Sequence, residues 1–323
     1  MEIQTHSVKT IGGYIGLQLS KGSVYHPGLI ALNTGRNAFE YILKVRNYTM
    51  VYLPYYTCEV LLEPLHKLNI AYKFYHLDEN LDPIIDFDIP TYSCLLYTNY
   101  YGLKTETVRR LTKEISNLII DNAQAFFCKP IANADTFYSC RKFFGVPDGA
   151  YLNIATQINL NLNQDQSIDR FSHLIKSIDI NIEEGYGDYI ENNKGLCNND
   201  IKTMSALTTN MLSGIDYEAC AAIRRENFAF LAEHLADKNL LSLKLSASDV
   251  PMVYPFLNDN TTIKQTLIKQ KIFVATYWPN VYDWASADSF EYFLAQNLIA
   301  LPIDHRYGLD DMRILVNALK PLI

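Results

Sequence analysis

The chain has 323 residues, of which 49% are hydrophobic and 20% are charged. This composition is typical of a globular protein with room for a large core and a second lobe. Lys and Arg total 28 against 35 Asp and Glu, so the formal net charge is -7. A nucleic-acid partner usually requires a basic patch, so this balance argues against one.

The sequence shows no sign of targeting to a membrane. No N-terminal stretch combines positive charge with a short apolar run, and no window of about 18 consecutive apolar residues occurs. We therefore expect no membrane partner and a cytoplasmic location. The six cysteines form no CxxC pair, so we expect reduced thiols without a metal site or a disulfide framework.

Residues 1–30 have no regular pattern, and the first clear element is a helix over residues 33–47. Its apolar residues recur at spacings of three and four, and Asn33 or Thr34 can cap its start. Gly35 at the helix opening allows backbone N–H groups to approach an anion, which the helix dipole also favours. A plain capped helix explains the Thr34-Gly35-Arg36 motif equally well.

Strands and helices then alternate. Apolar runs predict strands near residues 50–54, 71–75, 94–98 and 118–120, with helical patterns between them. This alternation implies crossover connections, and therefore a mainly parallel sheet with helices on both faces. Ligands of such sheets bind at the carboxyl ends of the strands. Four polar residues lie where a strand is predicted to end: Tyr56, Asn99, Asp121 and Ser139.

Asp121 ends a buried strand, and two interpretations of it remain open. An Asp at this place is often only the N-cap of the next helix. Alternatively, it is a carboxylate in a cleft of low dielectric constant, where a protonated ring nitrogen of a cofactor keeps both groups charged.

Lys142 lies in a loop between two predicted strands, beside Arg141 and close to a Pro147-Asp148-Gly149 turn. A lysine ammonium in a dry, positively charged setting loses its proton readily, and the free amine can form a Schiff base with a carbonyl cofactor. The simpler interpretation is a surface lysine beside a turn.

The second half of the chain begins with a polar, Asn-rich segment at residues 156–203, which we interpret as a lid or an arm that reaches a neighbouring subunit. A long helix at 215–235 follows. Strands at 241–245, 252–256 and 272–277 and helices from 261 and over 310–319 predict a small α+β lobe. We therefore divide the chain into domains 1–210 and 211–323.

In their order and spacing, these motifs resemble the pyridoxal-phosphate (PLP) enzymes of the aspartate-aminotransferase fold, fold type I, and most of all the DegT-type sugar aminotransferases. The likeness covers most of the chain. It rests on Asn33-Thr34-Gly35-Arg36, Leu53-Pro54-Tyr55-Tyr56-Thr57-Cys58, Asp121-Asn122-Ala123-Gln124, Ser139-Cys140-Arg141-Lys142, Arg224-Arg225-Glu226-Asn227-Phe228 and Leu301-Pro302-Ile303-Asp304-His305-Arg306-Tyr307. The family fold implied is α/β, with a mainly parallel central sheet, helices on both faces and a small C-terminal α+β domain.

The resemblance also implies roles for single residues. Lys142 would be the catalytic residue, holding PLP as a Schiff base and moving a proton. Asp121 would keep the pyridine nitrogen protonated. Gln124 would contact the ring face or its phenolic oxygen, to which Asn99 would donate. The phosphate would be bound by Thr34, Gly35, the backbone of Arg36, and Ser139.

The chain departs from the family pattern at two places in the site. Cys58 stands where the family has an aromatic that stacks on the cofactor, so we expect Tyr56 to stack instead. Phe137 stands where the family has its phosphate-binding serine, and Ser139 lies two residues nearer to Lys142.

The function that the resemblance implies is transfer of an amino group from an amino-acid donor to a keto acceptor, such as a nucleotide-linked keto sugar. A homodimer with a shared active site is implied too, and the Tyr-rich segment 186–189 and Tyr277-Trp278 are candidates for its contact or for the substrate mouth. Two alternatives remain open: a PLP-dependent lyase or other PLP chemistry on an amino acid, and a non-catalytic protein with the PLP fold.

Overall fold

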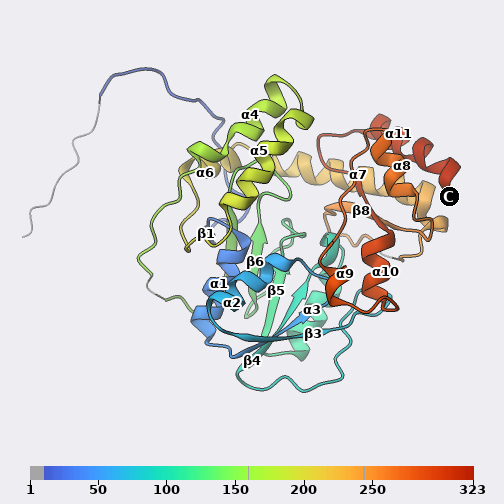
Figure 1. The fold of residues 1–323 in the computed structure, drawn as a ribbon. Coiled ribbons are helices and arrows are strands. Elements are labelled where there is room, and N and C mark those ends of the chain that lie inside the picture. Colours follow the sequence, from blue (N-terminus) through green and yellow to red (C-terminus); the bar gives the residue numbers. More distant parts are fainter. Residues whose placement is uncertain (1–10, 159, 243) are drawn as a thin grey trace, which may run out of the picture.

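The computed structural model describes residues 11–158, 160–242 and 244–323. Its central sheet has seven strands in the order β1-β7-β6-β5-β4-β2-β3 (Figure 1). The strands are β1 (Ile30–Leu32), β2 (Met50–Pro54), β3 (Ala71–Tyr75), β4 (Ser93–Thr98), β5 (Leu118–Asn122), β6 (Asp135–Ser139) and β7 (Ala150–Asn153). β3, β2, β4, β5 and β6 run parallel to their neighbours in that series, and β7 is antiparallel to both β6 and β1. The mainly parallel sheet predicted from the sequence is confirmed.

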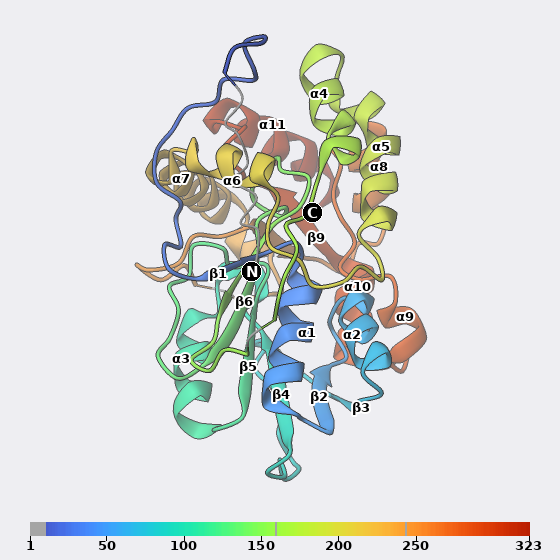
Figure 2. The same cartoon turned by 90° about the vertical axis from the view of Figure 1, so that its left-hand side faces the viewer.

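Helices cover both faces of this sheet, as predicted. α1 (Gly35–Arg46) and α2 (Leu62–Lys67) lie on one face, and α3 (Thr105–Glu114) lies on the other (Figure 2). Alternate strand residues serve the two cores: Val51 and Leu53 pack on the α1 side, whereas Tyr52 packs on the α3 side. This alternation follows from the two-residue period of a strand.

A second, two-stranded sheet pairs β8 (Val253–Leu257) antiparallel with β9 (Leu298–Pro302). The helices of this part are α7 (Tyr217–Leu235), α8 (Ile263–Lys269), α9 (Val281–Trp284), α10 (Phe290–Asn297) and α11 (Leu309–Leu319). α6 (Ala206–Ser213) precedes them. The small α+β lobe is therefore present, and the domain boundary at residue 210 stays a prediction.

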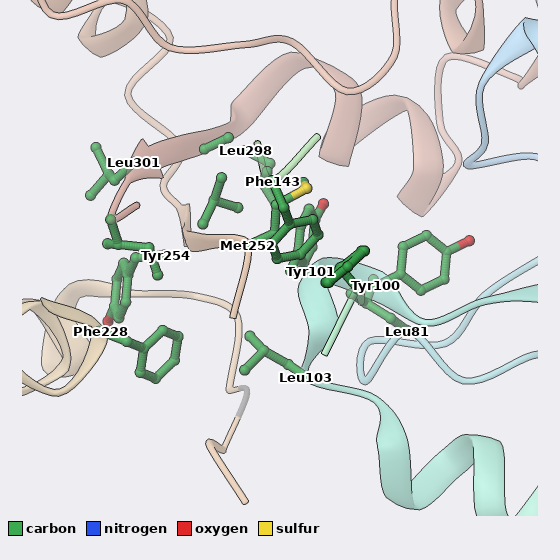
Figure 3. Close-up of a cluster of buried hydrophobic side chains, with 14 of the residues drawn as sticks. Leu81, Tyr100, Tyr101, Leu103, Phe143, Phe228, Met252, Tyr254, Leu298 and Leu301 are labelled. Atoms are coloured by element: carbon green, nitrogen blue, oxygen red, sulfur yellow. The ribbon is translucent and has the colours of Figure 1, made fainter. Parts of the chain in front are cut away.

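The hydrophobic core is continuous between the two sheets (Figure 3). Tyr100 and Tyr101, which follow β4, belong to the same buried cluster as Met252 and Tyr254. The backbone N–H of Met252 also donates to the Tyr101 carbonyl at 2.8 Å. Burial of this shared surface fixes the small lobe against the carboxyl edge of the central sheet.

Two of the predicted strands are not formed. Residue 243 lies outside the described residues, and the rest of 241–245 has no strand. In its place the Asn239 side chain pairs with β8: its Oδ1 accepts from the Leu257 N–H at 2.8 Å and its Nδ2 donates to the Pro255 carbonyl at 2.8 Å. In 272–277 only Ala275 forms a bridge, with Ala300. The Asn239 side chain thus satisfies backbone hydrogen-bonding groups of β8 that a third strand would otherwise have paired with.

Segment 156–203 contains two helices, α4 (Ser172–Asp179) and α5 (Ile182–Gly195). The sequence analysis found no helix here because the segment is polar and Asn-rich. Asn181 nevertheless caps α5, since its side chain accepts from the Glu184 N–H at 2.9 Å. Among the described residues, no helix is long and apolar enough to cross a membrane.

Candidate active site

The carboxyl edge of the central sheet gathers most of the predicted site residues. The register pairs Thr98 at the end of β4 with Asp121 of β5, and Asp121 with Phe137 of β6. Asn99 follows β4 directly, and its N–H donates to the Asp121 carbonyl at 2.9 Å. Ser139 ends β6.

The N-terminus of α1 faces the end of β6. Thr34 is the N-cap, and its Oγ1 accepts from the Asn37 N–H at 3.1 Å. A Cβ added to Gly35 would lie 3.8 Å from the Phe137 ring and 4.0 Å from Ser139 Cβ. The Arg36 side chain forms an ion pair with Glu63 of α2, so we assign anion binding at the helix end to its backbone N–H. The first N–H groups of a helix have no partner within it, so this end can receive an anion.

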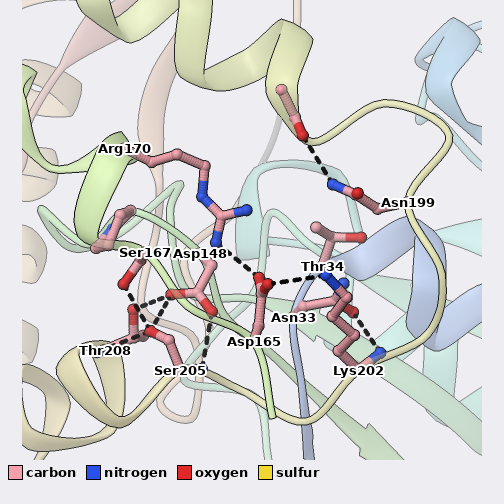
Figure 4. A network of polar contacts seen from close by, with 12 residues as sticks. Asn33, Thr34, Asp148, Asp165, Ser167, Arg170, Asn199, Lys202, Ser205 and Thr208 are labelled. Carbon is pink, nitrogen blue, oxygen red and sulfur yellow. Dashed lines mark hydrogen bonds and ion pairs between the residues drawn. The ribbon is translucent and has the colours of Figure 1, made fainter. Parts of the chain in front are cut away.

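A polar network holds the loops around this helix end (Figure 4). Asn33 accepts the Gly149 N–H on its carbonyl at 2.6 Å, and its side chain donates to the Asp200 carbonyl at 3.0 Å. Asp148 has no exposed surface, and it accepts from the Ser205 N–H at 2.9 Å, from Ser205 Oγ at 2.7 Å and from the Thr208 hydroxyl. The loop from β7 to α6 is thereby tied to the loop that carries Lys142.

Lys142 lies at the tip of a tight turn. The carbonyl of Cys140 accepts from the N–H groups of Phe143 at 3.1 Å and Phe144 at 3.0 Å, and the Cys140 N–H donates to Gly149 at 3.0 Å. Phe143 and Phe144 are buried, whereas the Lys142 side chain is exposed. The turn therefore uses two aromatic anchors to present one amine to the cleft.

The Lys142 charge acts on the Asp121 carboxylate. One carboxylate oxygen of Asp121, Oδ1, accepts from the Ala123 N–H at 2.7 Å, and the other has no hydrogen-bond partner in the described part of the chain. Burial raises the pKa of Asp121, and the nearby Lys142 charge opposes this rise. The Thr98 hydroxyl lowers it too, although the two groups lack hydrogen-bond geometry. Burial likewise raises the pKa of Cys58, and the Lys142 charge again opposes this rise.

Gln124 and Asn99 are fully buried behind this pair. Gln124 Oε1 accepts from the Tyr101 N–H at 2.8 Å, and Asn99 Oδ1 accepts from the Lys104 N–H at 3.0 Å. Their amide nitrogens are enclosed and have no partner among the described residues. The side-chain amide NH2 group of each residue is therefore free to donate to a ligand. The predicted cofactor contacts of both residues stay predictions.

Tyr56 is not brought to the cleft surface. Its exposed fraction is 0%, its hydroxyl lies 3.0 Å from the Tyr101 hydroxyl, and its ring packs edge-on against Trp278. Stacking on a ligand requires an open ring face, and the structure does not provide one here. Cys58, two residues on, interacts electrostatically with Lys142.

Two further residues, Arg141 and Tyr277, interact with Tyr189 of α5. Arg141 lies over the Tyr189 ring of α5, with 5.7 Å from guanidinium carbon to ring centroid. Tyr277, before α9, has its pKa raised by burial first and then by Tyr189 and Cys58. The sequence analysis listed Tyr277 and the segment 186–189 as candidates for a subunit contact or substrate mouth, but gave Arg141 no role. Its position next to Lys142 was the available signal.

Solved structures with the same architecture are sugar aminotransferases and related proteins. The chain is similar to the sugar aminotransferase CalS13 from Micromonospora echinospora, with 14% identity, 92% of this chain and 88% of that one covered, and a TM-score of 0.66. NtdA from Bacillus subtilis with bound cofactor PMP is 14% identical, with 90% of this chain and 72% of that one covered and a TM-score of 0.64. DesI in the presence of its TDP-sugar product is 16% identical, with 90% of this chain and 79% of that one covered and a TM-score of 0.62.

The chain has the fold of these aminotransferases. They cover at least 90% of it, which confirms the predicted PLP fold type I architecture. No family model matches the sequence, and no curated protein sequence matches it either. At this low identity the likeness establishes the fold, and the chemistry must be argued from the cleft.

Proposed function

We propose that this protein is a PLP-dependent aminotransferase, which moves an amino group from an amino-acid donor to a keto acceptor. The observation that carries the proposal is the pair of Lys142 and Asp121, an exposed amine that interacts electrostatically with a buried carboxylate at the carboxyl edge of this fold. Ligands of open α/β sheets bind at this edge.

The residues present fit the cofactor. Lys142 offers a primary amine, and Asp121 has a carboxylate oxygen without a partner among the described residues. The first N–H groups of α1 and the Ser139 hydroxyl lie together at the other end of the cleft and suit a phosphate. NtdA, which shares this fold, holds PMP in its solved structure.

PLP, when bound, supplies an electron sink for negative charge that develops at Cα of the amino donor. In this chain Lys142 would be the covalent anchor and would then carry a proton to and from the reacting carbon. Asp121 would place a negative charge beside the ring nitrogen, and burial strengthens that interaction because water is excluded. Phe143 and Phe144 hold the Lys142 turn in place.

For the acceptor we propose a keto sugar linked to a nucleotide. DesI, of the same fold, was solved with its TDP-sugar product, and this supports the substrate class. A homodimer with a shared active site, the domains 1–210 and 211–323 and a cytoplasmic location complete the proposal. Sedimentation of the purified protein at several concentrations tests the dimer, which a single monomer mass would contradict.

The decisive experiment is an absorbance spectrum after addition of PLP, with and without borohydride. We expect the wild type to give a visible band that reduction converts to a covalent adduct. Lys142→Ala should lose both, because the variant lacks the anchoring amine. The control is Lys113→Ala, at an exposed position of α3, which should behave like the wild type. Absence of a band in the wild type would contradict the proposal.

The two alternatives separate in the same preparation. A PLP-dependent lyase would form the band but release a cleaved or deaminated product without leaving an amine on an acceptor. A non-catalytic protein would give no turnover with any donor. Incubation with amino acids and detection of the matching keto acid by mass spectrometry distinguishes these outcomes from transamination.

A further inference from the structure

Arg141 is a cation that lacks an anionic partner in the described part of the chain. Its Nη2 donates to the neutral Oδ1 of Asn193 at 2.5 Å, and its guanidinium lies over the Tyr189 ring. Its Nε is enclosed and has no hydrogen-bond partner among the described residues. A charge taken out of water without a counter-charge is costly, typically several kcal/mol, so such a residue usually has a function.

The neighbouring arginines differ in this respect. Arg36 pairs with Glu63, and Arg170 pairs with Asp165 at 2.7 Å. Burial lowers the pKa of Arg141 most, Tyr189 opposes this, the Arg36 charge lowers the pKa further, and Asp148 and Arg170 have smaller effects of opposite sign. Arg36 and Arg170 are each paired with a carboxylate of this chain, whereas Arg141 has no such ion pair among the described residues.

The place of Arg141 in the fold defines what it can neutralise. The Cys140 N–H donates to the Gly149 carbonyl and the Gly149 N–H donates to the Asn33 carbonyl, so the turn that carries Arg141 adjoins the start of α1. Ser139 lies two residues before Arg141, at the end of β6. The positive end of the α1 dipole, its first N–H groups, a hydroxyl and the guanidinium thus converge. All of them are donors or positive, which is the environment of a bound oxyanion with more than one negative charge.

We propose that Arg141 binds the phosphate of PLP together with the first N–H groups of α1 and Ser139. The proposal rests on the proposed function and deepens it. It also gives a reason for Phe137, which stands where the resembled family has a phosphate-binding serine, because a guanidinium supplies stronger, charge-assisted hydrogen bonds than a hydroxyl. Asn193 and Tyr189 would orient the guanidinium from α5. The carboxylate of the amino donor is the other oxyanion that this residue can bind.

The test compares PLP with pyridoxal, which has the same aldehyde and no phosphate. Dissociation constants for both are measured by absorbance titration of the wild type, Arg141→Gln and Arg141→Lys. A charge-assisted hydrogen bond is worth about 1.5–3 kcal/mol, so Arg141→Gln should weaken PLP binding by about 10- to 100-fold. Pyridoxal binding should stay unchanged, and inorganic phosphate should compete with PLP far less in Arg141→Gln than in the wild type.

Arg141→Lys keeps the charge and should recover part of the loss. Arg109→Gln, at an exposed position of α3, is the matched control and should bind both compounds like the wild type. Circular dichroism melts verify that each variant is folded. If Arg141→Gln does not fold, Arg141→Lys decides the question. Arg141→Lys should bind PLP more weakly than the wild type does and should bind pyridoxal equally well.

Three results would overturn the assignment. An unchanged ratio of PLP to pyridoxal affinity in both variants would remove Arg141 from the phosphate. A loss confined to the amino donor, seen as weaker glutamate-induced spectral change, would assign Arg141 to the donor carboxylate instead. No adduct of the wild type with either compound would refute the proposed function itself, which distinguishes that failure from a failure at Arg141 alone.

Discussion

Tyr56 carries a buried hydroxyl whose partner is the Tyr101 hydroxyl at 3.0 Å, and Tyr101 is fully buried as well. Burial raises the pKa of both phenols far enough to keep them neutral. Tyr101 also has a positive φ of 57°, and Gln124 holds its N–H. The hydrogen bond between Tyr56 and Tyr101 therefore stabilises the loop that follows β4.

At this residue scale we expect Tyr56→Phe and Tyr101→Phe each to lower the free energy of unfolding by about 1 kcal/mol, because each leaves a buried hydroxyl without its partner. The double variant should lose less than the sum of the two. Urea unfolding of the four proteins forms the double-mutant cycle. Fully additive losses would mean that the two hydroxyls do not interact.

The same residue allows a test of stacking. Tyr56→Leu removes the ring and keeps an apolar side chain, so we expect a stability loss but an unchanged PLP dissociation constant in the folded protein. A marked rise in that constant without the same rise for Tyr56→Phe would return the stacking role to Tyr56.

At the scale of single elements, Gly35 and Arg36 at the start of α1 have different roles, which the Thr34-Gly35-Arg36 motif did not distinguish. The Gly35 position opens toward Ser139 and Phe137, whereas the Arg36 side chain turns toward Glu63. The two side-chain positions therefore serve different purposes: space for a ligand at Gly35, and attachment of α1 to α2 at Arg36.

We expect Gly35→Val to weaken PLP binding, because its methyl groups occupy the space in front of the helix N–H groups. Arg36→Met should instead lower stability by about 1–3 kcal/mol, since Glu63 then loses the partner of a mostly buried pair. PLP titration and urea unfolding of both variants measure these effects. The assignment of phosphate binding to backbone groups fails if Arg36→Met loses more PLP affinity than Gly35→Val.

On the scale of the whole molecule, acid stability depends on His26. This residue is buried, its Nε2 lies 2.7 Å from the Phe126 carbonyl, and its ring packs against Tyr25, Tyr138 and Tyr151. Burial lowers the pKa of His26 to about 4, the Phe126 carbonyl opposes this, and the Lys129 charge lowers it further. The N-terminal segment and the sheet are thus joined by a histidine that must stay neutral.

Because the unfolded chain takes up this proton near pH 6.5 and the folded chain only near pH 4, stability is lost as the pH falls through that window. His26 should account for a loss of about 2 kcal/mol between pH 7 and pH 5. Urea unfolding at both pH values should show a smaller loss for His26→Gln than for the wild type. His66→Gln, at an exposed position, should keep the wild-type dependence.

The features that could be predicted from the sequence are local in origin. The spacing of apolar residues and the Thr34 cap predicted α1, and the alternation of strands with helices predicted the parallel sheet and placed Asp121 and Ser139 at its carboxyl edge. These properties follow from residues that are near one another in the chain, so periodicity and capping chemistry report them. The turn that carries Lys142, between two predicted strands, is likewise a local feature that the sequence predicts.

Contacts between side chains of distant segments could not be predicted in this way and are visible only in the folded chain. Tyr56 became a core residue because Tyr101 and Trp278 enclose it, and Asn239 took the place of an edge strand because β8 lies beside it. Among the described residues Arg141 has no carboxylate partner, because α5 places Asn193, 52 residues away in the sequence, beside it. Burial and pairing across such separations depend on how the elements pack, which no local pattern of residues encodes.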